Sequence, residues 1–218
     1  ELGLSYEIVH YQRDPNTMLA PASLRAVHPL GKSPVITDGG NTVAESGAIV
    51  EYLVSRYGNG RLIPPENTPE RLRYTYWMHY AEGSAMLPLL LKLIFSHVAK
   101  APMPFFVKPI VRGVVKNVNQ AFIGPQLKLH FDYIESELGK SPQIGNHFMF
   151  LESELSKREW FAGPAFTAAD IQMSFPLEAA SARGGIAGPL TRALVERMHA
   201  RPAYRAALEK GGPYELMS

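Results

Sequence analysis

Residues 28–46 read HPLGKSPVITDGGNTVAES, and they hold the clearest structural signals in the chain. Two short apolar runs, 35–37 and 42–44, flank an Asp-Gly-Gly-Asn sequence that is typical of a tight turn between antiparallel strands. Ser46 is a natural N-cap for the helical pattern that follows, and Gly58 is a natural stop. We therefore expect a small β-hairpin followed directly by a helix that begins at Ser46.

The sequence differs on the two sides of a Gly- and Pro-rich cluster at 58–69, GNGRLIPPENTP, which is the best linker candidate. Before this cluster the predicted elements are short, and the β-rich run YEIVHY at 6–11 is interpreted as a strand. After it, apolar residues recur at helical spacing. We expect an α/β domain over 1–57, a linker over 58–69 and an all-helical domain over 70–218.

Apolar stripes predict helices throughout the second domain. They cover residues 69–95, 107–118, 127–138, 189–199 and 202–210. Gly124-Pro125 separates two of these stripes and predicts either a kink or two separate helices. Two similar runs, ESELGK at 135–140 and ESELSK at 152–157, indicate two amphipathic helices.

The run FTAADI at 166–171 marks the start of a further helix. Thr167 can cap the amide of Asp170, and the carboxylate of Asp170 can reach back to Thr167. This reciprocal pattern is that of a capping box, so we expect a sharply defined helix start at this point.

Charge and hydropathy exclude several classes of protein. The 218 residues carry 22 Lys and Arg against 20 Asp and Glu, and the resulting net charge of +2 is too small for a dedicated nucleic-acid or membrane-surface binder. The longest apolar stretch, 85–95, contains a proline and a lysine and is too short to span a bilayer. Lys108, Arg112 and Lys116 share one helix face, which is interpreted as solvated. We expect no nucleic-acid partner and no membrane partner.

The chain has no cysteine, which rules out disulfides, cysteine-ligated zinc and a thiol nucleophile within these residues. The seven histidines form neither an HExxH motif nor an i,i+4 pair, so no metal is expected. A reducing cytoplasm is consistent with this composition.

The two ends of the predicted hairpin carry groups that suit a peptide-like ligand. With a cis Ser33–Pro34 bond, the backbone N–H and C=O of Ser33 would turn outward and pair with a ligand backbone, as an added strand does. Ser46 and the free amides of its helix start offer a carboxylate pocket, and Glu45 suits an ammonium group. A ligand with an α-amino-acid end and an internal peptide bond would match all three.

Several segments, in order along nearly the whole chain, resemble cytosolic glutathione S-transferases. They are HPLGKSPV at 28–35, ESGAIVEYL at 45–53, WFAG with FTAADI at 160–171, and RMHARPAY at 197–204. YWMHYAEGS at 76–84 is similar to microbial members. The resemblance implies an α/β plus all-α fold, with a thioredoxin-like N-terminal domain, truncated at its start, followed by a C-terminal helical bundle.

The resemblance also implies a role for each candidate site residue. Ser33 would give backbone hydrogen bonds to the cysteinyl part of glutathione, with Pro34 cis. Glu45 and Ser46 would hold the γ-glutamyl end. Lys32 would face the glycyl carboxylate, or it is a plain solvated lysine.

Further roles depend on assembly and on a second substrate. In a homodimer of the family type, Glu82 could approach the glutathione of the partner subunit. The candidates for an apolar co-substrate pocket are Tyr76, Trp77, Met86, Phe105 and Phe106, and core packing explains each of them equally well.

The family's catalytic Ser, Tyr or Cys has no counterpart in this sequence. ELGLSYE at 1–7 resembles the end of the family's first helix and the start of its second strand. We expect about twenty residues before Glu1, because a sheet that lacks a central strand leaves backbone groups unpaired. The catalytic residue is expected among them, and its identity is unknown.

The resemblance implies conjugation of the glutathione thiolate to a small apolar electrophile, with glutathione as co-substrate. Two alternatives remain on the same fold: a glutathione-dependent disulfide reductase or peroxidase, and a non-enzymatic glutathione-binding interaction protein. The missing catalytic residue would separate them. A cysteine would favour thiol–disulfide exchange, and a serine or tyrosine would favour conjugation.

Overall fold

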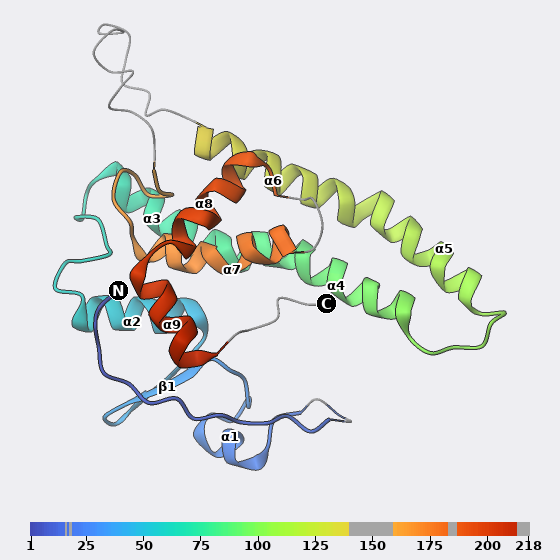
Figure 1. The fold of residues 1–218 in the computed structure, drawn as a ribbon, viewed down its shortest axis with the longest axis horizontal. Coiled ribbons are helices and arrows are strands. Elements are labelled where there is room, and N and C mark those ends of the chain that lie inside the picture. The colour runs from blue at the N-terminus through green and yellow to red at the C-terminus, as the bar shows by residue number, and fades with distance from the viewer. Residues whose placement is uncertain (16, 18, 140–158, 183–186, 213–218) are drawn as a thin grey trace, which may run out of the picture.

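The computed structural model describes residues 1–15, 17, 19–139, 159–182 and 187–212, in which a small N-terminal unit precedes a helical body (Figure 1). The N-terminal unit comprises α1 (Ala22–Val27), β1 (Val35–Asp38), β2 (Asn41–Ala44) and α2 (Ser46–Tyr57). The helical body comprises α3 (Pro69–Tyr80), η1 (Ala81–Ala85), α4 (Met86–Lys100), α5 (Lys108–Val118), η2 (Asn119–Ile123), α6 (Gly124–Gly139), α7 (Ala168–Ala182), α8 (Pro189–His199) and α9 (Pro202–Gly211). The predicted order of an α/β unit and a helical domain is confirmed, while the domain limits stay a prediction.

β1 and β2 form the predicted antiparallel hairpin, and each strand is one residue longer than its apolar run. The register pairs Val35 with Ala44 and Asp38 with Asn41, so two glycines make the turn. The first of them, Gly39, has a φ of +58°, a left-handed conformation that glycine adopts without steric cost. The turn sequence therefore sets the register of the hairpin.

The strand expected at 6–11 is a wrong prediction. The described residues before α1 contain no helix or strand, and the side chains at 6–10 are exposed. A β-rich run becomes a strand only where a neighbouring strand completes its hydrogen-bond ladder. The sheet found in the described residues consists of β1 and β2 alone, so this segment has no partner there.

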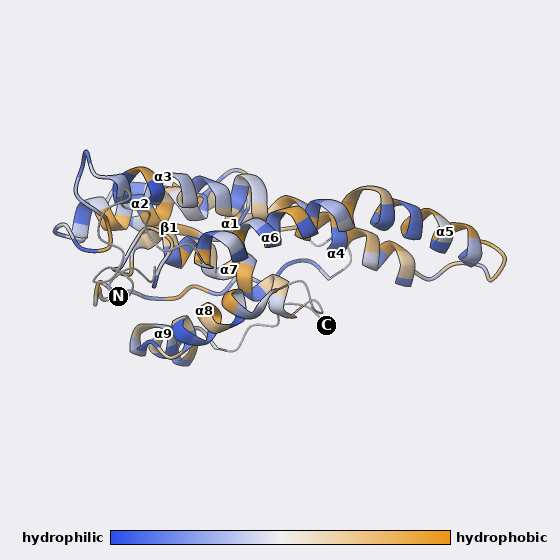
Figure 2. Ribbon diagram, turned by 90° about the horizontal axis from the view of Figure 1, so that it is seen from above, coloured by the Kyte–Doolittle hydropathy of each residue, from blue (hydrophilic) through white to orange (hydrophobic). Residues whose placement is uncertain are grey.

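Two long helical rods dominate the helical body (Figure 2). α3, η1 and α4 run without interruption from Pro69 to Lys100, beyond the predicted end near Phe95. α5, η2 and α6 likewise follow one another directly, with the π-helical turn η2 placed before Gly124-Pro125. A π-helical turn is wider than an α-helical one, and here it accommodates the distortion at Gly124-Pro125. The two predicted stripes therefore belong to one continuous helical segment. The ESELSK run at 152–157 lies outside the described residues.

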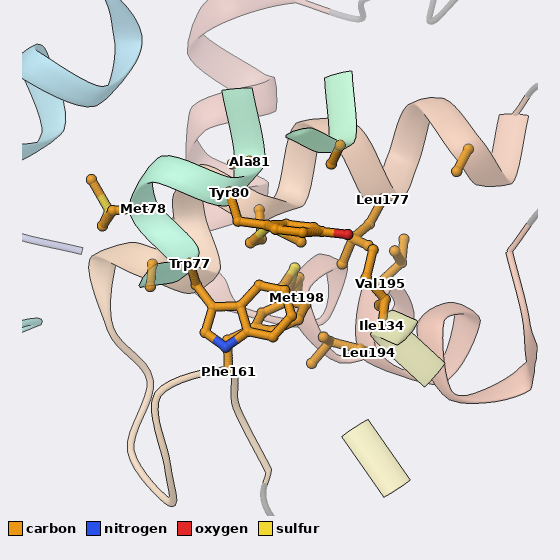
Figure 3. Packing of buried hydrophobic residues seen from close by; sticks show 14 of the residues in the cluster. Trp77, Met78, Tyr80, Ala81, Ile134, Phe161, Leu177, Leu194, Val195 and Met198 are labelled. Carbon is orange, nitrogen blue, oxygen red and sulfur yellow. The ribbon is translucent and has the colours of Figure 1, made fainter. Parts of the chain in front are cut away.

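The hydrophobic core lies inside the helical body (Figure 3). Trp77 of α3 is 1% exposed, and its ring centroid lies 4.5 Å from that of Phe161. Leu177 of α7 and Leu194 of α8 belong to the same cluster. Each such side chain stabilises the fold by about 1.5–3 kcal/mol through burial. α2 contributes Val54 to this cluster, which anchors the N-terminal unit to the body.

Asp170 defines the start of α7, as the capping-box pattern predicts. Its carboxylate accepts hydrogen bonds from the backbone N–H groups of Phe161 (2.8 Å) and Thr167 (2.7 Å) and from the Thr167 hydroxyl (3.0 Å). The Asp170 carboxylate thus caps the backbone N–H of Thr167, as expected. The Thr167 hydroxyl donates to this carboxylate, so the expected hydrogen bond from the Asp170 amide to that hydroxyl does not form. Burial raises the pKa of Asp170 to about 6.

Candidate functional site

The hairpin register brings the two predicted ligand-binding segments together. Val35 opens β1 and pairs with Ala44, which closes β2. The residues one step beyond this pair are therefore Pro34 and Glu45, at the same end of two strands that lie about 4.8 Å apart. The Ser33–Pro34 loop and the helix start after Glu45 therefore meet at one candidate site, although eleven residues of sequence separate them.

The loop before β1 contains the cis bond that the sequence interpretation supposes. The Ser33–Pro34 peptide bond is cis, and both residues are exposed. The buried Gly31 precedes them with a φ of +56°, and a β-carbon there would lie 2.7 Å from the β-carbon of Ala20. Glycine is therefore required at this position for the loop to pass close to the N-terminal segment.

The helix begins at Ser46 as expected, but the predicted N-cap is shifted by one residue. Glu45 is the N-cap, because its carbonyl accepts the first helical hydrogen bond from Ile49 at 2.9 Å, and Ser46 is the first helical residue. Glu45 has φ 73° and ψ 126°, which a non-glycine residue rarely adopts. Strain of this kind is concentrated at binding and catalytic sites. The exposed Glu45 side chain and the half-buried Ser46 lie at this bend.

The first turn of α2 has the features of an anion-binding helix start. The Glu45 side chain makes no capping hydrogen bond to it, and the first turn contains no acidic residue. Backbone N–H groups at a helix start carry partial positive charge and bind carboxylates readily. Ser46 adds a hydroxyl beside these groups, as the sequence interpretation proposes.

A carboxylate from the helical body lies next to this helix start. A β-carbon at Gly47, the second residue of α2, would lie 3.8 Å from Nε2 of Gln172 and 4.0 Å from Oε2 of Glu82. Gln172 is buried in α7, and its Nε2 donates a 2.7 Å hydrogen bond to Oε1 of Glu82 in η1. Glu82 therefore lies beside α2 of its own chain. Sequence reasoning missed Gln172, because nothing in the local pattern relates α7 to α2.

Asp38 holds α2 against the hairpin. Its Oδ2 accepts hydrogen bonds from the hydroxyls of Tyr57 (2.5 Å) and Tyr52 (2.7 Å), both on α2. These donors hold the pKa of the Asp38 carboxyl below its usual range. Arg56 lies 3.5 Å from the same oxygen. This contact fixes the far end of the hairpin, so the site end keeps its position relative to α2.

Lys32 is exposed immediately before the cis bond, and it has no ion pair within the described residues. The apolar residues proposed for a co-substrate pocket do not come together. Trp77 belongs to the core, and Phe105 and Phe106 lie in the connection between α4 and α5, at the far end of the rods from β1 (Figure 1). Periodicity identifies apolar faces of helices, but it does not identify what each face contacts.

A small hollow lies beside η1, between the two rods. Its volume is about 140 Å³, and its lining includes Leu87, Leu91, Phe122 and His130. Ligand pockets usually measure about 300–1,000 Å³, so this hollow alone does not make a co-substrate site. Among the described residues, no group of three His, Asp or Glu side chains is placed to hold a metal ion.

Comparison with known proteins agrees with this architecture. Residues 1–55 match the family model for the glutathione S-transferase N-terminal domain, and residues 99–202 match that for the C-terminal domain. A thioredoxin-like unit with a small sheet, followed by a helical domain, defines the glutathione transferase fold.

Individual relatives support the same family. Glutathione S-transferase 1 of Saccharomyces cerevisiae is 32% identical over 188 residues, covering 84% of this chain and 73% of that protein. Glutathione S-transferase 3 of Schizosaccharomyces pombe is 35% identical over 180 residues, covering 83% and 66%. The solved glutathione S-transferase of Actinobacillus pleuropneumoniae superposes with a TM-score of 0.69 at 28% identity, covering 99% of this chain and 86% of that one. The chain belongs to the cytosolic glutathione S-transferase family, and it spans two thirds to three quarters of these yeast relatives.

Proposed function

We propose that the protein binds glutathione where the hairpin meets α2 and presents its thiol to a small apolar electrophile, as a glutathione S-transferase. The hairpin register carries this proposal, because it joins the cis Ser33–Pro34 loop to the open helix start at Ser46. Membership of the family supports glutathione as the ligand.

Each part of the tripeptide has a chemical counterpart in the site. The backbone of Ser33 pairs with the cysteinyl residue, as one strand pairs with another. The first turn of α2 and the Ser46 hydroxyl bind the γ-glutamyl carboxylate. Glu45 and Glu82 provide negative charge for the ammonium group, and Lys32 faces the glycyl carboxylate.

Binding in this orientation serves the chemistry of conjugation. A free thiol has a pKa of about 8.5, so only a minor fraction of glutathione is thiolate at neutral pH. The thiolate is the nucleophile, and holding it beside an electrophile replaces an encounter in solution by a reaction within one complex. The residues named above bind and orient the tripeptide for this step.

We also propose that the protein acts as a homodimer in the cytoplasm. The α3–α4 rod carries exposed apolar side chains, among them Leu72 and Leu87, which are 75% and 57% exposed. The exposed Leu87, Leu90 and Ile94 recur at helical spacing along α4, and a contiguous apolar patch of this kind is typical of a surface that a partner covers. The family resemblance favours a second copy of the chain as that partner.

The test is a calorimetric titration of the folded protein with reduced glutathione. We expect saturable binding of one glutathione per chain. Ser46→Ala should weaken it by about 1.5–3 kcal/mol, because the ligand carboxylate loses a hydrogen bond. Ser55→Ala, an exposed serine at the other end of α2, is the matched control and should change nothing. Equal affinities of both variants would contradict the site assignment.

A further inference from the structure

The α4–α5 arm, defined as residues 86–118, projects from the helical body and ends in an aromatic tip (Figures 1 and 2). The tip is the connection 101–107 between the two helices. It carries Phe105 and Phe106, which are 83% and 64% exposed, with ring centroids 5.6 Å apart. The proposed glutathione site uses neither ring.

The arm is also strongly cationic. Residues 86–118 contain five lysine or arginine side chains and no aspartate or glutamate. Lys100 ends α4, Lys108 begins α5, and Arg112 follows one helical turn later, so these cations lie on the two helix ends that flank the tip. All three side chains are exposed. The charge of this region is far from the near-neutral balance of the whole chain.

We propose that the arm tip docks onto the surface of an anionic lipid bilayer. Phe105 and Phe106 enter the interface between headgroups and acyl chains, where aromatic rings lose their contact with water. Lys100, Lys108 and Arg112 meet the negatively charged headgroups just outside it. Tip-to-tip contact between two copies of the chain would bring like charges together, so a lipid surface fits this tip better than a second copy does.

Surface docking differs from spanning the membrane. The rod from Pro69 to Lys100 is long and apolar enough to cross a bilayer by length and composition. Its residues Trp77, Ala81 and Leu89 are nevertheless buried in the protein core. The proposed contact involves the tip alone. The proposal revises the expectation, drawn from net charge, that no membrane partner exists, because an average over the chain conceals a local charge.

The test is co-sedimentation of the full chain with vesicles of phosphatidylcholine, with and without about one third phosphatidylserine. We expect binding only to the anionic vesicles, and weaker binding as salt rises from about 0.1 M to about 0.5 M. The double variant Phe105→Ser/Phe106→Ser should reduce the partition coefficient about tenfold or more. Lys108→Ala/Arg112→Ala should reduce it about 25-fold, since each cation contributes about fivefold.

Matched controls are Leu129→Ser and Arg205→Ala, which remove an exposed apolar and an exposed cationic side chain away from the tip. Both should bind vesicles like the unmodified protein. Circular dichroism and glutathione titration should be unchanged in every variant, which separates this proposal from the proposed function. Failure to bind anionic vesicles, or equal binding by tip variants and controls, would overturn it. So would a fall in molar mass by light scattering in the tip variants alone, which would make the tip a contact between copies.

Discussion

Gln172 donates a 2.7 Å hydrogen bond from Nε2 to Oε1 of Glu82, and this bond links α7 to the π-helical turn of the first rod. The amide is buried, whereas the carboxylate is exposed beside the first turn of α2. A buried donor restricts the carboxylate to one side of the helix start. The helical body thereby places an oriented negative charge beside the proposed site, whose other residues belong to the N-terminal unit.

Replacing Gln172 by Leu removes this donor while keeping a side chain of similar size. We expect glutathione affinity to fall about three- to tenfold, because a hydrogen bond of this kind contributes about 0.5–1.5 kcal/mol. Calorimetric titration measures the change. Glu82→Gln keeps a hydrogen-bonding partner but removes the charge, and it should weaken binding about tenfold or more. If neither variant alters affinity, Glu82 has no role in the site.

Gly31→Ala should disrupt the loop before the cis bond. The added β-carbon would lie 2.7 Å from the β-carbon of Ala20 and 2.9 Å from Cγ of Arg25, at a φ of +56°. Gly39→Ala is the matched control, because its φ is +58° and nothing lies within 4 Å of the new atom. The control should cost about 1 kcal/mol through backbone strain alone. Gly31→Ala should cost about 2 kcal/mol more and also weaken glutathione binding. Equal unfolding free energies in denaturant would refute this account.

Asp170→Ala should be strongly destabilising. It leaves the N–H groups of Phe161 and Thr167 without the buried acceptor that they now share. An unsatisfied buried donor costs about 1–3 kcal/mol, so the pair should cost about 3 kcal/mol or more in urea unfolding. Asp132→Ala removes an exposed carboxylate from α6 and should cost less than about 0.5 kcal/mol. Similar losses in the two variants would mean that the capping box contributes little.

His130 makes the stability of the helical body depend on pH. Burial holds the pKa of its imidazole below the usual value, and Nδ1 lies 2.7 Å from the hydroxyl of Tyr80. Near pH 6.5 the unfolded chain therefore binds a proton more readily than the folded chain. The contribution of His130 to stability should fall as pH drops below that value and recover above it.

Unfolding free energies at about pH 5.5 and 7.5, for the unmodified protein and His130→Gln, measure this effect. The variant has no imidazole to protonate, so its stability should change less between the two pH values. An identical pH dependence in both proteins would show that His130 does not contribute.

Local sequence was sufficient for the parts of the fold that local interactions determine. The hairpin turn and the start of α7 depend on Gly39 and Asp170 acting over a few residues, and both were predictable. The segment 6–11 was not, because a strand depends on a partner that propensity does not supply. The cis Ser33–Pro34 bond was an expectation that the structure confirms.

The sequence indicates which residue types make up the candidate site better than it indicates their surroundings. The proximity of Pro34 and Glu45 follows from hairpin register, which the turn sequence predicts. The contribution of Gln172 depends on how α7 packs near α2, and no periodicity in either helix contains that information. Phe105 and Phe106 have the residue type of a pocket lining, but their surroundings are set by the length of the two rods.

The π-helical turn η1 also affects which chain lengths evolution can accept. Glu82 lies inside it, and α4 continues directly from it. One residue added to a regular α-helix rotates everything beyond it by about 100°. A π-helical turn takes up one extra residue locally, so Leu89 keeps its place in the core and α4 keeps its direction. Single-residue deletions in relatives should therefore be tolerated at residues 81–85 better than within α3 or α4.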